Sequence, residues 1–256
     1  MLNKKTQVTL FLVLGLVVLI AISFMSYLSA DKTKTDIKKE AEITTSSGLP
    51  SSLLPLKSNI DFCVDEIGKR AIVYTGLYGG YYKVPEPKLV YFYDGVPYYV
   101  FRSANYMPTR ETVESQISDY VMEQLPACVN NLQDFQGANV EGAIESVSST
   151  IGKDAVFIHI DYPINIYKGD AKAQFLKFRT EVPVRLDTIY DIASEIVEGK
   201  IKNNGALCAD CLIDLASENN VFIDVVSHED SMILTIFDNV TKIDENDYIF
   251  SFAMTK

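Results

Sequence analysis

Residues 8–30 read VTLFLVLGLVVLIAISFMSYLSA and hold no charged residue. A helix of that length spans roughly 34 Å, which is enough to cross the hydrocarbon core of a bilayer. Lys4 and Lys5 precede the stretch with no acidic residue nearby, so the N-terminus is expected in the cytoplasm and the rest outside. The sequence therefore predicts a cytoplasmic tip and a transmembrane helix in residues 1–30.

This apolar stretch is predicted to be a retained anchor rather than a cleaved secretory signal. A signal has a shorter apolar core, followed by small residues at positions −3 and −1 of the cut. A cut after Ala30 would leave Leu28 at position −3, and no cysteine follows the core for lipid attachment. We therefore expect a lipid bilayer around residues 8–30 and a single-pass protein of the cell membrane.

The composition of the whole chain narrows the class of protein. The 256 residues include 23 Lys+Arg and 34 Asp+Glu, giving a net charge of −11, and 48% of them are hydrophobic. That apolar content excludes low-complexity disorder, because it can bury enough surface to offset chain entropy. The negative charge argues against nucleic acid as a partner, since phosphate binding needs a basic face.

The chain after the apolar stretch divides into a linker and two further regions. Residues 31–57 are charged and then rich in Ser, Thr, Gly and Pro, which is typical of a stalk, although an ordered loop packed on the domain is an equal alternative. Residues 58–136 are predicted to form a helix–hairpin–helix region with an aromatic cluster. Residues 137–256 are predicted to form an α+β sheet domain.

Local signals in residues 58–136 place its elements. Ser58-x-x-Asp61 has capping-box spacing, and Asp94-Gly95 is a strong hairpin signal. Pro97 fits only an edge or the start of a strand, so the hairpin is expected at a sheet margin. The expected elements are a helix from Ser58 to Gly79-Gly80, strands over Lys88–Tyr93 and Val96–Arg102, and a helix over Arg110–Cys128.

Residues 137–256 show mostly strand patterns. Hairpins at both ends with helices between them, rather than strict βαβ alternation, predict an α+β fold with antiparallel sheets and about four helices in the whole domain. The expected elements are strands at Gly142–Ile151, Ala155–Ile166, Ala171–Pro183, Val221–Val226, Met232–Phe237 and Tyr248–Met254, a helix capped by Asp187, and a short helix over Leu207–Ser217.

Lys4-Lys5-Thr6-Gln7-Val8-Thr9 resembles the class III signal of archaeal type IV pilin-like proteins, in which a basic pair precedes Gln-x-Ser. The resemblance implies processing at Gln7 and assembly into a filament. The family's acidic residue four positions after the Gln is replaced here by Phe11.

A second resemblance spans most of the chain. It consists of the basic N-terminus, the apolar helix, a Cys63-bearing helix ending in GLYGGYY (residues 76–82), and the final Tyr248-x-Phe-x-Phe-Ala253. In this order the segments resemble a group of membrane-anchored surface proteins of small-genome archaea. That group has no established activity, so the resemblance implies location alone.

Four cysteines, Cys63, Cys128, Cys208 and Cys211, allow three connectivities. An even number outside the membrane favours disulfides, and we expect pairs Cys63–Cys128 and Cys208–Cys211, the alternative for the first pair being buried free thiols. Cys208-x-x-Cys211 near a helix start also suggests a thiol oxidoreductase. Asp210 disfavours a thiolate, however, so a structural bridge is the preferred interpretation.

No catalytic, metal or cofactor site is predicted. The two histidines, His159 and His228, lie in no recognisable hydrolase or zincin motif. Gly76-x-x-Gly79-Gly80 is not followed by a helix, as a phosphate loop would be. Asp244–Asp247 lacks the ligand spacing and glycine of an EF-hand loop and is interpreted as a solvated turn.

Aromatic residues are concentrated in residues 74–106, which hold 11 of the 28 aromatics of the chain. Tyrosines on an exposed sheet face suit protein or glycan contacts. Cross-strand pairing that only stabilises the hairpin is the alternative. The expected contact surface comprises Tyr81, Tyr82, Tyr91, Tyr93, Tyr98 and Tyr99.

Together these features predict a non-catalytic, membrane-anchored cell-envelope protein with an extracytoplasmic α+β domain for structural or adhesive contacts. A pilin-like filament subunit and an extracytoplasmic thiol oxidoreductase acting through Cys208 and Cys211 are the alternatives. Asn239-Val240-Thr241 is the only N-x-[ST] sequon, and an outer location would expose Asn239 to glycosylation.

Overall fold

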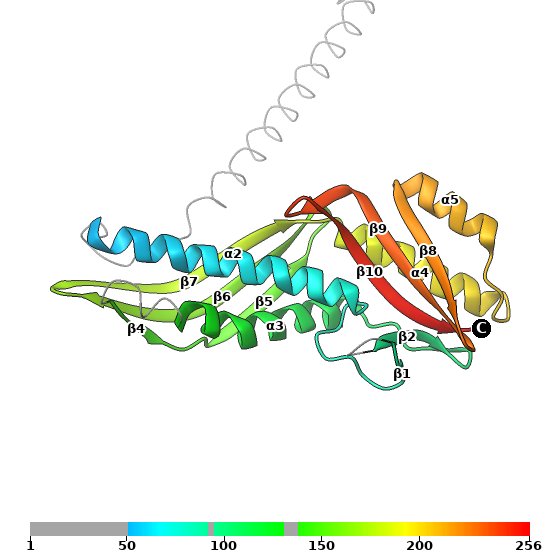
Figure 1. Ribbon diagram of the computed structural model, residues 1–256, viewed down its shortest axis with the longest axis horizontal. Helices are drawn as coiled ribbons and strands as arrows, with labels where there is room; N and C mark the ends of the chain where they lie inside the picture. Colours follow the sequence, from blue (N-terminus) through cyan, green and yellow to red (C-terminus); the bar gives the residue numbers. More distant parts are fainter. Residues whose placement is uncertain (1–50, 92–94, 131–137) are drawn as a thin grey trace, which may run out of the picture. The chain divides into compact units, whose positions relative to one another are not determined.

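The computed structural model describes residues 51–91, 95–130 and 138–256 (Figure 1). The fold is α+β, as predicted, with four α-helices and two largely antiparallel sheets in the described residues. The expected membrane span at residues 8–30 and the pilin-like segment lie outside these residues. Within them, no helix combines the length and apolar character needed to cross a membrane.

One sheet is built around the long hairpin of β6 and β7. The strands β4 and β5 pair with the other edge of β6 in succession, β4 with Ile164–Tyr167 and β5 with Val156–Asp161. The sheet consists of β4 (Asn139–Gly142), β5 (Ser146–Ile151), β6 (Ala155–Lys168) and β7 (Ala171–Pro183).

The expected single strand Gly142–Ile151 is therefore wrong, because the structure divides it. Pro163 lies inside β6 and has no N–H for the ladder, and the pairing of β6 with β7 shifts register between Asp161 and Ile164. A Cβ added to Gly142 would lie 2.2 Å from the Pro163 carbonyl oxygen. β4 and β6 therefore approach each other closely at Gly142 and Pro163. The pairing of β5 with β6 begins only at Ser146.

The second sheet has the order β1-β2-β10-β9-β8, with β3 also paired to β2. The β2–β10 pairing is parallel, so the sheet is mixed rather than wholly antiparallel as expected. Pro97 pairs with Lys88 of the two-residue β1, and the hairpin forms the margin of the sheet, as predicted. The strands are β1 (Lys88–Leu89), β2 (Val96–Phe101), β3 (Ala104–Asn105), β8 (Val221–His228), β9 (Ser231–Ile243) and β10 (Asn246–Thr255).

The hairpin of β9 and β10 is longer than predicted. Asp244 and Glu245 form its turn with φ angles of 49° and 69°. Positive φ at both central residues is the geometry of a type I′ turn, which matches the twist of the flanking strands. The turn expected at Asp244–Asp247 is therefore shorter, and β10 begins at Asn246.

The four helices are α2 (Leu54–Leu77), α3 (Arg110–Asn130), α4 (Leu186–Lys202) and α5 (Ala209–Asn219). A 3₁₀ turn over Ser51–Leu53 precedes α2, so part of the expected stalk, before Ser58, is helical. Pro55 lies in the first turn, where a missing N–H costs nothing. Leu53 and Leu56 are buried and attach this turn to the core.

The start of α4 also differs from the prediction. Arg185 is its N-cap residue, and Asp187 lies inside the first turn instead of capping the helix. The Asp187 carboxylate accepts a hydrogen bond of 2.9 Å from Arg110 Nε at the start of α3. Asp187, which was expected to cap the helix, therefore forms an ion pair between α3 and α4.

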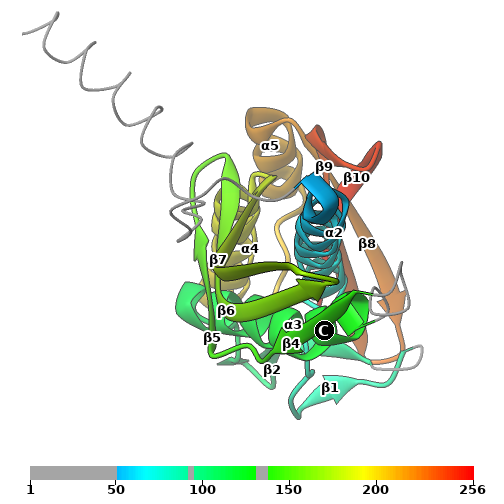
Figure 2. The same cartoon turned by 90° about the vertical axis from the view of Figure 1, so that its left-hand side faces the viewer.

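The helix α2 packs against both sheets and against α3, and Figure 2 shows it between the two sheets. Two glycines, one toward each sheet, permit this approach. A Cβ at Gly68 would lie 2.7 Å from Thr180 Cγ2 on β7, and one at Gly76 would lie 2.5 Å from the Ile249 carbonyl oxygen on β10. Buried residues from both predicted regions, 58–136 and 137–256, share one hydrophobic core around α2.

A buried ion pair joins α4 to β9. Arg185 Nη2 lies 2.5 Å from Asp238 Oδ1, and the Asp238 side chain is fully buried. Burial acts to raise the pKa of Asp238, but hydrogen bonds from Arg185, Thr241 and the Val240 N–H outweigh it and lower that pKa. Arg185 Nη1 also donates to the Asn219 carbonyl at the end of α5, so one guanidinium connects three elements.

We predict that Gly76→Ala destabilises the protein by about 1–3 kcal/mol, because the new methyl group meets backbone and a buried ring. Gly199→Ala in α4 is the matched control, since nothing lies within 4 Å of a Cβ there. It should stabilise the helix by about 0.5–1 kcal/mol. Chemical denaturation of the full chain measures both changes, and equal effects of the two variants would contradict the close packing at Gly76.

We predict that Asp238→Asn lowers the free energy of unfolding by about 3 kcal/mol at pH 7. This is the low end of the range for a buried ion pair, because Arg185 keeps some contact with solvent. The pKa of Asp238 is lower in the folded state than in the unfolded chain. As the pH falls, the unfolded chain therefore protonates this carboxylate first. The stability that the ionised Asp238 contributes is therefore complete above about pH 4 and is lost as the pH falls through the folded-state pKa. A difference between wild type and variant that stayed constant down to pH 2 would refute the assignment.

Candidate functional site: the groove beside α2

A groove of about 540 Å³ lies between the C-terminal half of α2, α3 and the β9–β10 hairpin. Its apolar lining includes Val73 and Leu77, which remain 39% and 42% exposed on the surface of α2. We refer to it as the α2 groove. Its lining residues are Glu66, Lys69, Arg70, Val73, Tyr74, Leu77, Tyr120, Ile243, Asp244, Asn246, Asp247, Tyr248 and Ile249.

Tyrosines from three segments meet at one side of the α2 groove. The Tyr74 ring of α2 lies 5.3 Å from the Tyr120 ring of α3, and 4.7 Å from the Tyr78 ring one turn further on. Tyr82 packs edge-on against Tyr120 at 5.1 Å, and its hydroxyl accepts a hydrogen bond from Gln124. Edge and tilted packing of this kind stabilises the junction of α2 and α3 and fixes these side chains.

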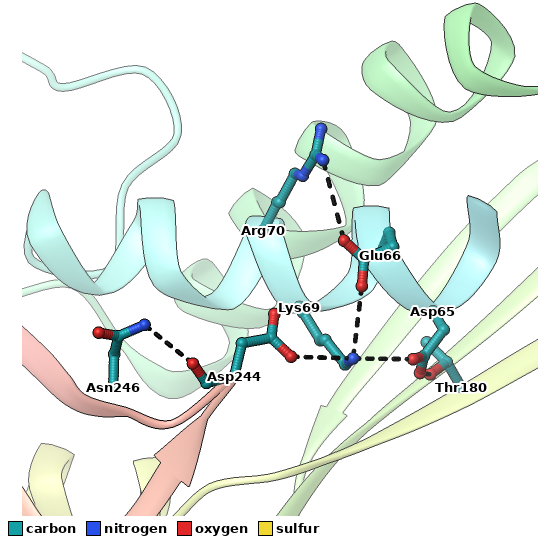
Figure 3. A network of polar contacts seen from close by, with 7 residues as sticks. All are labelled: Asp65, Glu66, Lys69, Arg70, Thr180, Asp244 and Asn246. Atoms are coloured by element: carbon teal, nitrogen blue, oxygen red, sulfur yellow. Dashed lines mark hydrogen bonds and ion pairs between the residues drawn. The ribbon is translucent and has the colours of Figure 1, made fainter. Parts of the chain in front are cut away.

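A charged network forms the other side of the groove (Figure 3). The Lys69 ammonium lies 3.1 Å from a carboxylate oxygen of Asp65 and 3.1 Å from one of Asp244, with Glu66 at 3.4 Å. Hydrogen bonds to Asp65 and Asp244 raise the pKa of Lys69. The ammonium is therefore firmly charged, and it connects α2 to the turn between β9 and β10.

This network extends beyond the groove. Asp65 also accepts a hydrogen bond of 2.9 Å from the Thr180 hydroxyl on β7, and Asn246 donates to the Asp244 carbonyl. The carboxylates of Asp65, Glu66 and Asp244 are thus engaged with Lys69, and α2 is connected to both sheets. Among the described residues, no group of three His, Cys, Asp or Glu side chains is placed to hold a metal ion.

Tyr248 contributes a buried hydroxyl to the lining of the groove. It is the one buried side-chain polar atom of the described residues without a hydrogen-bond partner. Burial raises the pKa of Tyr248, with a smaller contribution from the charge of Asp238, so the phenol is neutral. A Cβ at Gly76 would lie 2.7 Å from this oxygen, which shows that α2 covers it.

The expected tyrosine contact surface needs correction at two positions. Tyr98 and Tyr99 are 8% and 0% exposed, so they are core residues and not a surface. Successive residues of β2 point to opposite faces, and both faces are covered here. Tyr99 stacks on Phe252 at 4.4 Å and donates to the Gly79 carbonyl, whereas the Tyr98 hydroxyl is hydrogen-bonded to Ser231.

The other expected contact residues are distributed differently. Tyr81 and Tyr82 are partly buried, Tyr91 packs against the His228 ring at 5.3 Å, and Tyr93 lies outside the described residues. Of the six, Tyr82 belongs to the aromatic cluster at the groove. Tyr74 and Tyr120 were not among the expected contact residues, although Tyr74 lies in the aromatic-rich residues 74–106 and Tyr120 in the expected helix Arg110–Cys128.

The cysteines form the two expected disulfides, Cys63–Cys128 and Cys208–Cys211. The first connects α2 to α3, with Cys63 buried. In the second, Cys208 is the N-cap of α5, and its sulfur accepts a hydrogen bond from the Cys211 N–H. Cys211 is exposed, and this disulfide lies at the end of the loop that follows α4.

The remaining candidate residues are at the surface. Asn239 is exposed on β9, which extends beyond the expected strand Met232–Phe237. His159 is exposed on β6, and His228 ends β8. Neither histidine lines the α2 groove.

We predict that the double variant Cys63→Ser/Cys128→Ser loses much more thermal stability than Cys208→Ser/Cys211→Ser. The first disulfide closes 65 residues, and chain-entropy arguments give it about 4 kcal/mol, whereas the second closes only three. Thermal unfolding of the full chain under non-reducing conditions measures the difference. Equal losses in the two double variants would show that the α2–α3 link is not a main source of stability.

Comparisons of the chain with protein-family models, with curated proteins and with solved structures gave no match. What the α2 groove does is therefore argued from its own residues.

Proposed function

We propose that the protein is a non-catalytic cell-envelope protein, held in the membrane by residues 8–30, whose extracytoplasmic domain binds a partner protein in the α2 groove. The observation that carries the binding site is the exposure of Val73 and Leu77 beside a fixed aromatic cluster. Exposed apolar side chains next to a rigid, charged rim are typical of a protein contact site.

The arrangement of the rings favours a protein over a glycan. A sugar ring stacks on an open aromatic face, but Tyr74, Tyr82 and Tyr120 pack edge-on or tilted against each other. The accessible apolar groups of the groove are aliphatic, chiefly Val73, Leu77 and Ile249. They suit apolar side chains of a partner, and Arg70 and Asp247 at the rim offer both signs of charge for orientation.

The charges of the groove support binding rather than catalysis. Lys69 is surrounded by three carboxylates, and its raised pKa removes it as a proton donor or acceptor near neutral pH. The Tyr248 phenol is neutral and covered by α2. Lys69 and its carboxylate partners thus hold α2 and the β9–β10 turn together.

The test places a photoreactive amino acid at position 77 of the full chain in its native cells. We expect illumination to give a discrete adduct of higher mass, because Leu77 would lie in the contact. Adding Val73→Asp, which brings a charge into the apolar contact, should reduce the adduct by about tenfold or more. Protease added to the intact cells should remove the adduct, since the domain is proposed to lie outside.

Position 90 provides the matched control. Val90 is 81% exposed but does not line the groove, so the same photoreactive residue there should give no such adduct. Equal adducts from positions 77 and 90, or none from position 77, would refute the groove as the contact site. An adduct that survives protease treatment of intact cells would refute the location alone.

A further inference from the structure

A second pocket lies on another part of the domain, around the buried Lys200 near the C-terminal end of α4. Lys200 is only 2% exposed. Its ammonium donates one hydrogen bond, of 2.5 Å, to the Gly205 carbonyl. Within the described part of the chain no carboxylate lies within ion-pair distance of this ammonium.

The pocket has a volume of about 190 Å³. It is formed where the end of α4 meets the β2–β3 turn and the end of β10, which lie close together in Figure 1. We refer to it as the Lys200 pocket. Its lining residues are Val100, Ser103, Lys200, Ile201, Asn204, Gly205, Thr255 and Lys256, and none of them carries a carboxylate side chain.

The polar lining is rich in hydrogen-bond donors. Ser103 has a hydroxyl group, Asn204 an amide, and Lys200 and Lys256 ammonium groups, whereas the Thr255 hydroxyl already accepts from the Arg102 N–H and donates to the Val100 carbonyl. The Lys256 ammonium donates to the Glu229 carbonyl, which holds its charge at this end of the domain. The domain as a whole is acidic, whereas none of the residues that line this pocket has an acidic side chain.

Lys200 itself is incompletely compensated. An ammonium has three N–H donors, and the protein provides one acceptor. A buried charge without a partner is costly, and burial indeed lowers the pKa of Lys200. Its position in the last turn of α4 explains the contact with the loop carbonyl, because cations favour helix C-termini. It does not explain why the amine is enclosed beside a pocket that is lined by no acidic side chain.

We propose that the Lys200 pocket binds a small oxyanion of the phosphate type, with Lys200 as its main contact. Such an anion brings the missing negative charge and several acceptor oxygens, and charge-assisted hydrogen bonds of this kind are strong. The volume suits a single oxyanion, because it is smaller than the 300–1,000 Å³ typical of pockets for larger ligands. The site is separate from the α2 groove and does not depend on the function proposed for it.

Inorganic phosphate is the probe. Binding to the full chain in detergent is measured by equilibrium dialysis with labelled phosphate, and stabilisation by thermal unfolding in phosphate against chloride of equal ionic strength. We expect one saturable site, competition by sulfate, and a rise of the melting temperature with phosphate. Lys200→Met retains the buried stem and should weaken binding by about tenfold or more.

Two further variants decide the interpretation. Lys202→Met is the control, because Lys202 is exposed, pairs with Glu198 and does not line the pocket; it should bind as the wild type does. Ser103→Asp places a carboxylate in the exposed turn and should weaken binding without altering the core, which keeps the test valid if Lys200→Met fails to fold. The absence of saturable binding, unchanged binding by Ser103→Asp or by folded Lys200→Met, or an equal loss in Lys202→Met would overturn the proposal.

Discussion

The close approach of α2 to two different sheets is the constraint on which the rest of the domain depends. Gly68 brings the helix onto β7, and Gly76, two turns later, brings it onto β10. A single methyl group at either position would meet neighbouring atoms at less than 3 Å. Because one helix serves as the packing partner of both sheets, they share one core and do not form two separate domains.

The α2 groove and the Lys69 network follow from this arrangement. The end of α2 lies against β10, so the turn between β9 and β10 comes within reach of Lys69, and that lysine is held by carboxylates from both elements. Val73 and Leu77 of α2 remain 39% and 42% exposed, and they line the groove together with Tyr120 of α3 and Ile249 of β10. The same packing that buries most of the helix thus leaves these two apolar side chains in a groove beside β10.

Short-range signals in the sequence predicted the elements well. The strand Ala171–Pro183 and the start of the helix at Arg110 agree with the structure, because alternation and helical spacing are local properties. The start of α2 was predicted too late, since Pro55 and the serines suggested a stalk, while the burial of Leu53 is a tertiary effect. The division of β4 from β5 depends on Pro163, which follows both strands in the chain.

The candidate sites were harder to predict for the same reason. Tyr98 and Tyr99 were expected at the surface, but whether a sheet face is open depends on elements distant in sequence. The groove needs α2, α3 and β10 together, and the Lys200 pocket needs α4, β2 and β10. Only the cysteine pairing was accessible, because few combinations of four cysteines exist and the spacing of the last two is so short.

The Cys63–Cys128 link also determines how far the chain can be drawn out by force. When the polypeptide is pulled from its two ends, the covalent bond carries the load directly from α2 to α3, and the residues between the two cysteines, which are 65 positions apart, bear no tension. At up to about 3.4 Å per residue, the oxidised chain is roughly 220 Å shorter at full extension than the reduced chain. The disulfide thus acts as a mechanical stop that limits the extension of an unfolded domain.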